Sequence, residues 1–255
     1  MNRIFFSFVS LHFMNIAIIG FGKMGQTIEQ IAKERNHHIA AIFNLDYPLS
    51  VDKLNGVDVA IEFSQPKSAI KNIKICAEAG VPVVVGTTGW YDHYEGVKKD
   101  VLNSNGALLA ATNFSVGVNI AFYINEIVAK VMSNYPYSVG ITETHHTQKL
   151  DAPSGTAISL GEGVMNNHAN FLNWKLTEHQ EHAQKGAVPI QALREENVPG
   201  THVVEYKNEI DSLELKHTAY NRLGFASGAV DAAEWIVGRK GVFSIQDMFN
   251  FGQYL

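Results

Sequence analysis

The chain has 255 residues, enough for one large domain or two small ones, and its 46% hydrophobic and 18% charged residues are ordinary for a globular protein. The net charge of −5, with no block of lysine and arginine, argues against nucleic acid or an anionic membrane as the main partner. Cys76 is the single cysteine, which excludes an internal disulfide and fits a reducing compartment.

The first thirteen residues, MNRIFFSFVSLHF, precede a segment that has the pattern of a domain start, MNIAIIGFGKMG. The run carries one basic residue but no small-residue cleavage site, and it is too short to cross a bilayer. We therefore interpret it as a misassigned start or an extension, and expect residues 1–13 to be dispensable. Nothing else in the sequence resembles a membrane segment, so we expect a cytoplasmic protein with no membrane partner.

Short apolar, β-rich runs alternate with amphipathic helical stretches through the first half of the chain. Near-continuous apolar strands between helices are typical of a parallel sheet covered on both faces. The sequence therefore predicts a doubly wound α/β domain. The expected strands cover residues 15–20, 38–43, 57–63, 81–86 and 106–112, and the expected helices cover 24–35, 66–79 and 91–103.

From about residue 115 the pattern changes. A helix over 116–132 aligns Ile120, Ile124, Ile127, Val128 and Val131 on one face. Strands and helices that are segregated along the sequence predict an α+β second domain, followed by a last helix over 225–238 that returns to the first. The other expected elements are a strand at 138–146, a helix at 154–166, and strands near 188–194, 202–207 and 213–218; the stretch 167–185 shows no clear pattern.

The sequence GFGKMG places three glycines directly after an apolar strand and at the start of a helix. The chain must turn tightly there, and in a dinucleotide-binding loop the pyrophosphate must approach the backbone closely. Both requirements favour glycine, because it has no side chain. The strand before and the helix after distinguish a dinucleotide-binding loop from an ordinary tight turn. The pattern therefore predicts dinucleotide binding at Gly20, Gly22 and Gly25, and the family resemblance described below extends the expected contacts to Phe21, Lys23 and Met24.

An acidic residue usually follows this motif by about 20 positions, at the end of the second strand, where it binds the ribose hydroxyls. Here that strand ends in IFNLD, which offers Asn44 or Asp46. Asn44 could bond a ribose hydroxyl and would not repel a 2′-phosphate, but no arginine beside it would hold that phosphate. The sequence therefore leaves the choice between NAD and NADP open.

Two further loops follow expected strands, GTTG at 86–89 and ATNFSVG at 111–117. In open α/β sheets, ligands bind beyond the carboxyl ends of the strands. Thr87, Thr88 and Asn113, with nearby amides, could hold the nicotinamide and its ribose, or they could be plain turn residues. The residues by themselves favour neither.

The stretch ETHHTQKLDAPSGTA (143–157) combines two histidines and a lysine with the expected start of a helix. Pro153 restricts the residue before it, and Ser154 is a good N-cap. Free amides near Gly155 and Thr156 would then form an anion site.

Lys149, His145 and His146 lie just upstream, so positive charge and hydrogen-bond donors could converge there on a carboxylated substrate. Glu143 and Asp151 raise the alternative of a zinc site. Neighbours in a strand point to opposite faces, however, and the run lacks the usual zinc spacing, so we predict no metal. A solvated lysine and a capping histidine are the structural alternative.

These residues resemble the 4-hydroxy-tetrahydrodipicolinate reductase family of the lysine and diaminopimelate pathway, formerly called dihydrodipicolinate reductases. ETHHTQKLDAPSGTA is similar to the family's specific signature, and GFGKMG, GTTG, NFSVGVN and FASGAV support it in order from about residue 14 to the C-terminus. The resemblance thins between 166 and 200. The sequence FNLD departs from it, because many members carry an acidic residue followed by arginine there.

The resemblance implies a Rossmann-type doubly wound parallel sheet with an inserted α+β domain for substrate binding and tetramerisation. The expected dinucleotide-binding domain covers residues 1–114 and is completed by 226–255; the inserted domain covers 115–225. The resemblance also implies a homotetramer, a small cyclic dicarboxylate as substrate, and reduced NAD or NADP as hydride donor.

By position, the resemblance assigns acid/base catalysis to His145 and proton donation to Lys149, either directly or through an ordered water. It assigns His146, Gly155 and Thr156 to the substrate carboxylates. Together with Asn44, the further dinucleotide contacts expected are Gly86, Thr87, Thr88, Ala111, Thr112, Asn113 and Phe114.

Two other interpretations stay open. One is another NAD(P)-dependent dehydrogenase of a small amino-acid intermediate, and the other is a dinucleotide-sensing module without catalysis. A sensor would not need both His145 and Lys149 beside an anion site, which argues for an enzyme.

Overall fold

A computed structural model describes residues 13–179 and 186–254. Most of the extension that we expect to be dispensable, residues 1–12, lies outside the described residues. The chain divides into two units, which we describe separately. One comprises the residues up to Ala110 together with Ala229–Ser244, and the other comprises Ala111–Gly228 with Ile245–Leu255.

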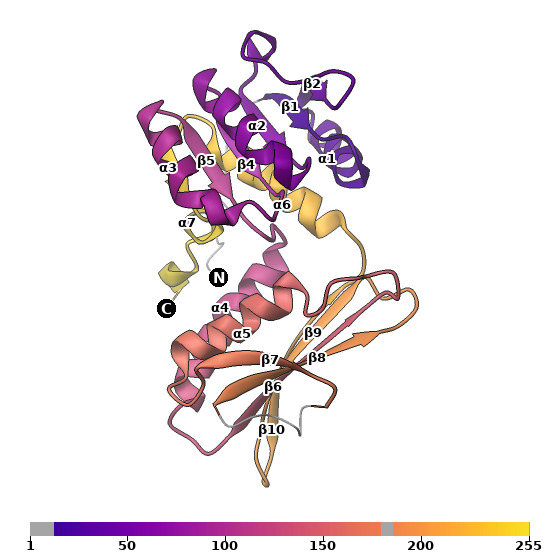
Figure 1. Ribbon diagram of the computed structural model, residues 1–255, viewed down its shortest axis with the longest axis vertical. Helices are drawn as coiled ribbons and strands as arrows, with labels where there is room; N and C mark the ends of the chain where they lie inside the picture. Colours follow the sequence, from indigo (N-terminus) through magenta and orange to yellow (C-terminus); the bar gives the residue numbers. More distant parts are fainter. Residues whose placement is uncertain (1–12, 180–185, 255) are drawn as a thin grey trace, which may run out of the picture. The chain divides into compact units, whose positions relative to one another are not determined.

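The first unit is built on a parallel six-stranded sheet with the strand order β2–β1–β3–β4–β5–β11 (Figure 1). The doubly wound α/β arrangement is confirmed. The edge strand β11 is an addition to the expected strands, because three residues are too few to show a hydrophobic period. The strands are β1 (Asn15–Ile19), β2 (His38–Phe43), β3 (Val59–Glu62), β4 (Val83–Val85), β5 (Ala107–Ala110) and β11 (Gly241–Phe243).

Alternate strand residues point to opposite faces of this sheet. Ala17 and Ile19 pack in one core with Ile73 of α2 (Pro66–Glu78) and Val101 of α3 (Tyr94–Asn103). Ile18, of the opposite parity, lies against α1 (Lys23–Glu34), where its methyl group limits the space at Gly25. The sheet is therefore covered on both faces, as near-continuous apolar strands require.

The helix α6 (Leu223–Ile236) crosses from the second unit into the first at residue 229. Arg35, at the end of α1, pairs with Asp231 at 2.6 Å and with Glu234 at 3.1 Å, which holds α6 beside α1. Val230 and Ala233 are buried, as the apolar spacing of this helix predicts. From residue 229 on, this helix belongs to the first unit.

The second unit holds a five-stranded mixed sheet with the order β10–β9–β6–β8–β7, in which β6 runs parallel to β8 and antiparallel to β9. Helices α4 (Val116–Met132) and α5 (Gly155–Asn167) pack side by side in this unit (Figure 1). Strand β7 lies in the stretch whose sequence shows no clear pattern. The strands are β6 (Ser138–His145), β7 (Asn173–Thr177), β8 (Ala187–Arg194), β9 (Gly200–Lys207) and β10 (Ser212–Ala219).

The apolar stripe of α4 does not form its buried face. Ile120, Ile124 and Val131 are 39%, 38% and 53% exposed. The side that packs inward mixes small, polar and apolar residues: Asn125 is fully buried and donates to the carbonyl of Leu160 at 2.9 Å, and Phe122 and Val128 pack against the core. A hydrophobic period marks an apolar face but does not say which face the core covers.

The end of the chain differs from the expected domain boundary. Residues 245–255, which we expected to complete the first domain, group with the second unit. Phe251 packs on Tyr123 of α4, with ring centres 5.5 Å apart, and Phe249 of α7 (Ile245–Phe249) stacks on Phe251.

Within the described ranges, no helix is long and apolar enough to cross a membrane.

Candidate active site

The glycine-rich loop gives each of its three glycines a different role. Gly20 has a φ of +93°, and a Cβ there would lie 2.3 Å from the carbonyl oxygen of Phe63. A Cβ at Gly25 would lie 2.2 Å from the carbonyl oxygen of Gly20, so this position needs glycine for close packing. Gly22 faces open space, with nothing within 4 Å of a Cβ. Gly20 and Gly25 are thus needed for the turn and the close packing, and the open side at Gly22 leaves the room that a pyrophosphate would need.

Helix α1 offers its first amides to such a ligand. Its N-cap is Gly22, which has no side chain to cap it, and its first turn holds no acidic residue. Uncapped amides at a helix start, together with the helix dipole, favour a bound anion. Lys23, Met24 and Gly25 supply these amides, so the residues present fit a dinucleotide.

A pocket of about 610 Å³ opens beside this loop, at the carboxyl ends of β1, β2 and β3. Asn44 lines it, and its side-chain oxygen accepts hydrogen bonds from the amides of Asp46 and Tyr47 at 2.9 and 2.8 Å. The side-chain amino group of Asn44 is therefore the part left to donate to a ribose. Lys71 of α2 lines the same pocket, a cation that is distant from Asn44 in the sequence.

The loop after β4 also fits a ligand. A Cβ at Gly86 would lie 2.1 Å from the ring of Phe63, so the glycine lets this loop close over that ring. Thr87 is buried, and its hydroxyl finds no hydrogen-bond partner in the described part of the chain. A buried hydroxyl without a partner costs free energy unless something binds it. Thr88, by contrast, is exposed.

The segment Ala111–Phe114 belongs to the second unit. Asn113 is buried; its amino group donates to the hydroxyl of Thr156 at 3.3 Å, and its oxygen accepts from the amide of Ser115 at 2.9 Å. A residue expected to contact the dinucleotide is thus bonded to one expected to contact the substrate. The contact of Asn113 with the dinucleotide stays a prediction. Its hydrogen bonds in the structure connect the start of α4 to the start of α5.

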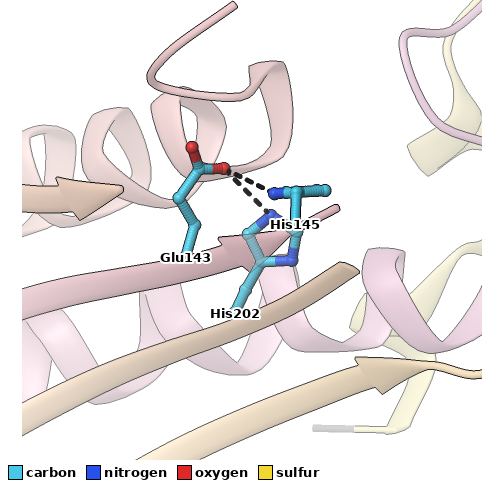
Figure 2. A group of neighbouring side chains, drawn as sticks. All are labelled: Glu143, His145 and His202. Carbon is cyan, nitrogen blue, oxygen red and sulfur yellow. Dashed lines mark ion pairs between the residues drawn. The ribbon is translucent and has the colours of Figure 1, made fainter. Parts of the chain in front are cut away.

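Strand β6 places the acid/base candidate. Alternation along the strand puts Glu143 and His145 on the buried side, and His146 follows directly after the strand, where it is half-buried. The Nδ1 atom of His145 lies 3.1 Å from a carboxylate oxygen of Glu143, and the Nε2 atom of His202 lies 3.8 Å from the same oxygen (Figure 2). A Cβ at Gly200 would lie 3.0 Å from the Nε2 of His145, so glycine leaves that nitrogen room.

Glu143 is fully buried and ionised. Its other oxygen accepts from the amide of Ser154 at 3.1 Å and lies 3.4 Å from the guanidinium of Arg194. Burial would raise the pKa of Glu143, but its contacts with His145 and Ser154 outweigh that effect and lower the pKa to about 2. A fixed negative charge therefore sits at the end of β6.

Lys149 lies in the loop after β6, and its side chain is 18% exposed. Its ammonium donates to both oxygens of Asp151, at 2.8 and 2.7 Å, and this contact is the chief cause that lowers the pKa of Asp151. Asp151 is itself largely exposed, so the pair is open to solvent on that side. Lys149 is therefore a partly buried cation whose position is fixed by its ion pair with Asp151.

The start of α5 has the N-cap that the sequence predicts, and its role as an anion site stays a prediction. The hydroxyl of Ser154 caps the helix by accepting from the amide of Ala157 at 3.2 Å, as the N-cap prediction requires. Glu143 takes the amide of Ser154, so the amides of Gly155 and Thr156 are the ones left to bind a ligand. His145, Lys149 and this helix start thus lie on connected segments of one unit.

Three residues of this site hold roles that the sequence pattern does not indicate. The pattern suggests Glu143 only as a zinc ligand, and it does not single out Arg194 or His202. The latter two come from strands that the sequence predicts, β8 and β9, which flank β6 in the sheet. The order of strands in the sheet brings them to Glu143, and no short motif contains that information.

His202 should make the fold sensitive to acid. Burial, followed by the nearby charge of His145, lowers the pKa of His202 from 6.5 to about 3. Between these two pH values the unfolded chain binds a proton at this imidazole that the folded chain does not. The free energy of unfolding should therefore decrease as the pH is lowered through this range, by up to about 1.4 kcal/mol per pH unit. The other charged or titratable groups acting on His202 are Glu143, His217 and Lys149.

Urea midpoints of the wild type and of His202→Asn, measured from pH 7 to pH 4, test this expectation. The wild type should lose stability more steeply than the variant as the pH falls. His93→Asn, at an exposed position of the first unit, is the control and should keep the wild-type slope. Equal slopes for the wild type and His202→Asn would show that the imidazole takes up its proton in the folded state near pH 6.5.

Known protein families and individual relatives match this chain along most of its length. The family model for the dihydrodipicolinate reductase N-terminus matches residues 14–114, and the one for the C-terminus matches residues 117–249. A 4-hydroxy-tetrahydrodipicolinate reductase from Christiangramia forsetii is 47% identical over 240 residues, 93% of this chain and 98% of the relative. One from Acinetobacter baumannii is 32% identical, over 88% of this chain and 92% of its own.

The fold agrees as well. The solved structure of a dipicolinate-bound dihydrodipicolinate reductase from Paenisporosarcina sp. TG-14 superposes with a TM-score of 0.73 at 22% identity. It covers 91% of this chain and 98% of its own, which shows a shared architecture. The structural match shows the fold alone, whereas the family models and the 47% identical relative show the family. This chain belongs to the 4-hydroxy-tetrahydrodipicolinate reductase family.

Proposed function

We propose that the chain reduces (2S,4S)-4-hydroxy-2,3,4,5-tetrahydrodipicolinate to tetrahydrodipicolinate, with His145 and Lys149 as its acid/base groups. Its relatives are 4-hydroxy-tetrahydrodipicolinate reductases, which are NAD(P)-dependent oxidoreductases. The observation that carries the proposal is that His145, Lys149 and the open amides of α5 are held together through Glu143 and its partners. The result is a donor-rich site, with Lys149 as a cation and two open helix amides, that suits a dicarboxylate.

The balance of the reaction indicates what the residues must do. The bound dinucleotide supplies a hydride, the site supplies one proton, and a water leaves the hydroxylated ring. Electrons pushed into the ring build negative charge, which Lys149 and His145 can offset while one of them delivers the proton. Lys149 donates directly or through an ordered water. The amides of Gly155 and Thr156, with His146, orient the carboxylates.

The two units divide the ligands between them in this proposal. The first unit holds the dinucleotide at the glycine-rich loop, the pocket beside Asn44, and Thr87. The second unit holds the substrate at the ends of β6 and α5. This division follows the expected domains, except that Ala111–Phe114, which we expected among the dinucleotide contacts, belongs to the second unit.

We also propose a cytoplasmic homotetramer. Support comes from the resemblance to the family and from apolar side chains that the single chain leaves exposed along α4, among them Val116 and Ile120. Such a stripe is costly in water and is typical of a surface that another subunit covers. Light scattering of the purified protein tests the tetramer.

Cofactor use should be relaxed or should favour NADH. The amino group of Asn44 can donate to a ribose hydroxyl, and the described pocket lining contains no arginine for a 2′-phosphate. Lys71 and Asp46 both line the pocket, so their charges oppose each other there. The measurement is kcat/KM for NADH and NADPH at one ionic strength.

A preference for NADPH above about a hundredfold, or about 2.7 kcal/mol, would contradict this expectation and reveal a phosphate site. Lys71→Met then shows whether this lysine is the cause. If it is, the variant should lose NADPH turnover and keep NADH turnover.

Two other functions stay in view. Another dehydrogenase of a small amino-acid intermediate would oxidise the same dinucleotides with a different substrate, and a sensor would bind dinucleotide without turnover. A coupled assay with freshly generated substrate separates these from the proposal. Both alternatives must explain why His145 and Lys149 lie beside an open helix start.

A further inference from the structure

Arg194 joins parts of the second unit that are distant in sequence. It is the last residue of β8, and its side chain is 22% exposed. The Nε atom donates to the carbonyl of Lys149 at 3.2 Å, and Nη2 donates to the carbonyl of Asp151 at 2.7 Å. One planar guanidinium thus holds the loop that carries Lys149 at two points of its backbone.

The same guanidinium lies 3.4 Å from Glu143, through both Nη1 and Nη2. Glu143 in turn contacts His145 with one oxygen and the amide of Ser154 with the other. The pair of Arg194 and Glu143 is therefore in contact with the histidine proposed for acid/base catalysis, the lysine loop and the amide of Ser154, the N-cap of α5. No other ion pair in the described ranges reaches all three.

The charges explain why the two residues occur together. A fully buried carboxylate without a cation nearby would be costly, and removing one partner of such a pair leaves the other uncompensated. Both Nη atoms approach the same oxygen of Glu143, which also accepts from the amide of Ser154, while the other oxygen faces His145; these contacts together fix the orientation of the carboxylate. Because Glu143 sets the place of both His145 and Ser154, the orientation of this carboxylate sets the spacing between the proton source and the substrate's anion site.

A metal ion is the competing explanation for these side chains. Glu143, His145 and His202 offer ligand atoms that all lie within 4.8 Å of one another. Arg194 already supplies the positive charge at Glu143, however, and the hydroxyl of Ser154 lies 3.0 Å from the Nε2 of His202. The site is built around a guanidinium, which a dication beside it would repel.

We propose that Arg194 and Glu143 form a positioning pair that acts through His145, Lys149 and the start of α5, without touching the substrate. The proposal rests on the proposed function, since it names what aligns that reaction. Misplacing a catalytic group by about 1 Å can cost on the order of a hundredfold in rate. Loss of one partner should therefore lower kcat in a variant that still folds, in addition to the stability that the uncompensated charge costs.

The variants Arg194→Met, Arg194→Lys and Glu143→Gln test the pair. Arg194→Met should lower kcat by roughly ten- to a hundredfold, and Arg194→Lys should recover only part of it, because lysine keeps the charge but not the fork. The solvent isotope effect on kcat should rise in the slow variants, because proton delivery becomes limiting. The double variant should lose less than the product of the two single losses.

Arg35→Met is the matched control. Arg35 is also a partly exposed arginine, with 27% of its side chain exposed, and it pairs with two carboxylates in the first unit. Its loss should lower the melting temperature and leave kcat and the isotope effect unchanged. Dinucleotide titration of every variant shows that the first unit is still folded.

Wild-type kcat in a folded Arg194→Met, or a loss no larger than that of Arg35→Met, would overturn the positioning role. A stoichiometric divalent ion in the purified protein, with activity lost on chelation, would overturn it as well. A wild type that does not reduce the substrate would refute the proposed function itself. An active wild type with normal variants would refute only the pair.

Discussion

Replacing Lys149 with alanine should lower kcat by roughly 10²–10⁴-fold, the usual span for a positioned acid or base. The lysine supplies positive charge and a proton where the ring becomes negative. Its ammonium is held by Asp151 at 2.7 Å, and Arg194 holds its backbone, so the group is fixed before the substrate arrives. Dinucleotide affinity should change little, because the dinucleotide loop belongs to the other unit. Turnover and dinucleotide titration, measured separately, check both parts.

Two comparisons sharpen this experiment. His145→Ala should resemble Lys149→Ala, and the double variant should lose less than the product of the two, since both groups serve one transition state. Lys130→Ala removes an exposed lysine from α4 in the same unit and should keep wild-type kcat. Near-normal turnover of a folded Lys149→Ala would refute the catalytic role while leaving the family assignment intact.

A bulky residue at Gly22 should abolish dinucleotide binding without unfolding the protein. A Cβ at Gly22 meets nothing within 4 Å, so leucine fits the free protein. Its side chain would then fill the space where the pyrophosphate approaches the start of α1. The dissociation constant should rise by at least about a hundredfold, or about 2.7 kcal/mol, while the melting temperature stays close to that of the wild type.

Other glycines of the first unit supply the controls. Gly96→Leu also introduces a side chain into open space, on α3, and should bind dinucleotide normally. Gly20→Ala should instead lower the melting temperature, because Gly20 has a positive φ and its Cβ would meet the carbonyl of Phe63. Wild-type affinity in Gly22→Leu would show that the pyrophosphate lies elsewhere.

Much of the first unit can be predicted from the sequence, because local pattern and topology agree there. Strand β2 begins and ends where the apolar run predicts, and α1 begins one residue earlier than expected. The glycine motif follows a strand and opens a helix, so the apolar pattern on either side is enough to interpret its three positions. Strand β11 and the place of residues 245–255 depend on contacts with distant elements, and no periodicity reports such contacts.

The candidate site can be predicted only where one segment contains it. His145, Lys149 and Ser154 lie within ten positions of one another, and the N-cap at Ser154 forms as expected. Arg194 and His202 reach Glu143 from β8 and β9, so their contribution depends on strand order and register. The exposed stripe on α4 shows the same limit, since the sequence reveals its apolar period but not its environment.

The proposed reaction can be followed in a coupled assay in which 4-hydroxy-tetrahydrodipicolinate is generated enzymatically in the cuvette and nicotinamide absorbance is recorded. The purified chain should oxidise NADH or NADPH only while the substrate is being made, and one dinucleotide should be consumed per tetrahydrodipicolinate formed. Lys149→Ala at equal concentration should lose most of this rate while still binding dinucleotide. A folded wild type that binds dinucleotide, yet shows no substrate-dependent oxidation with either form, would contradict the proposed reaction.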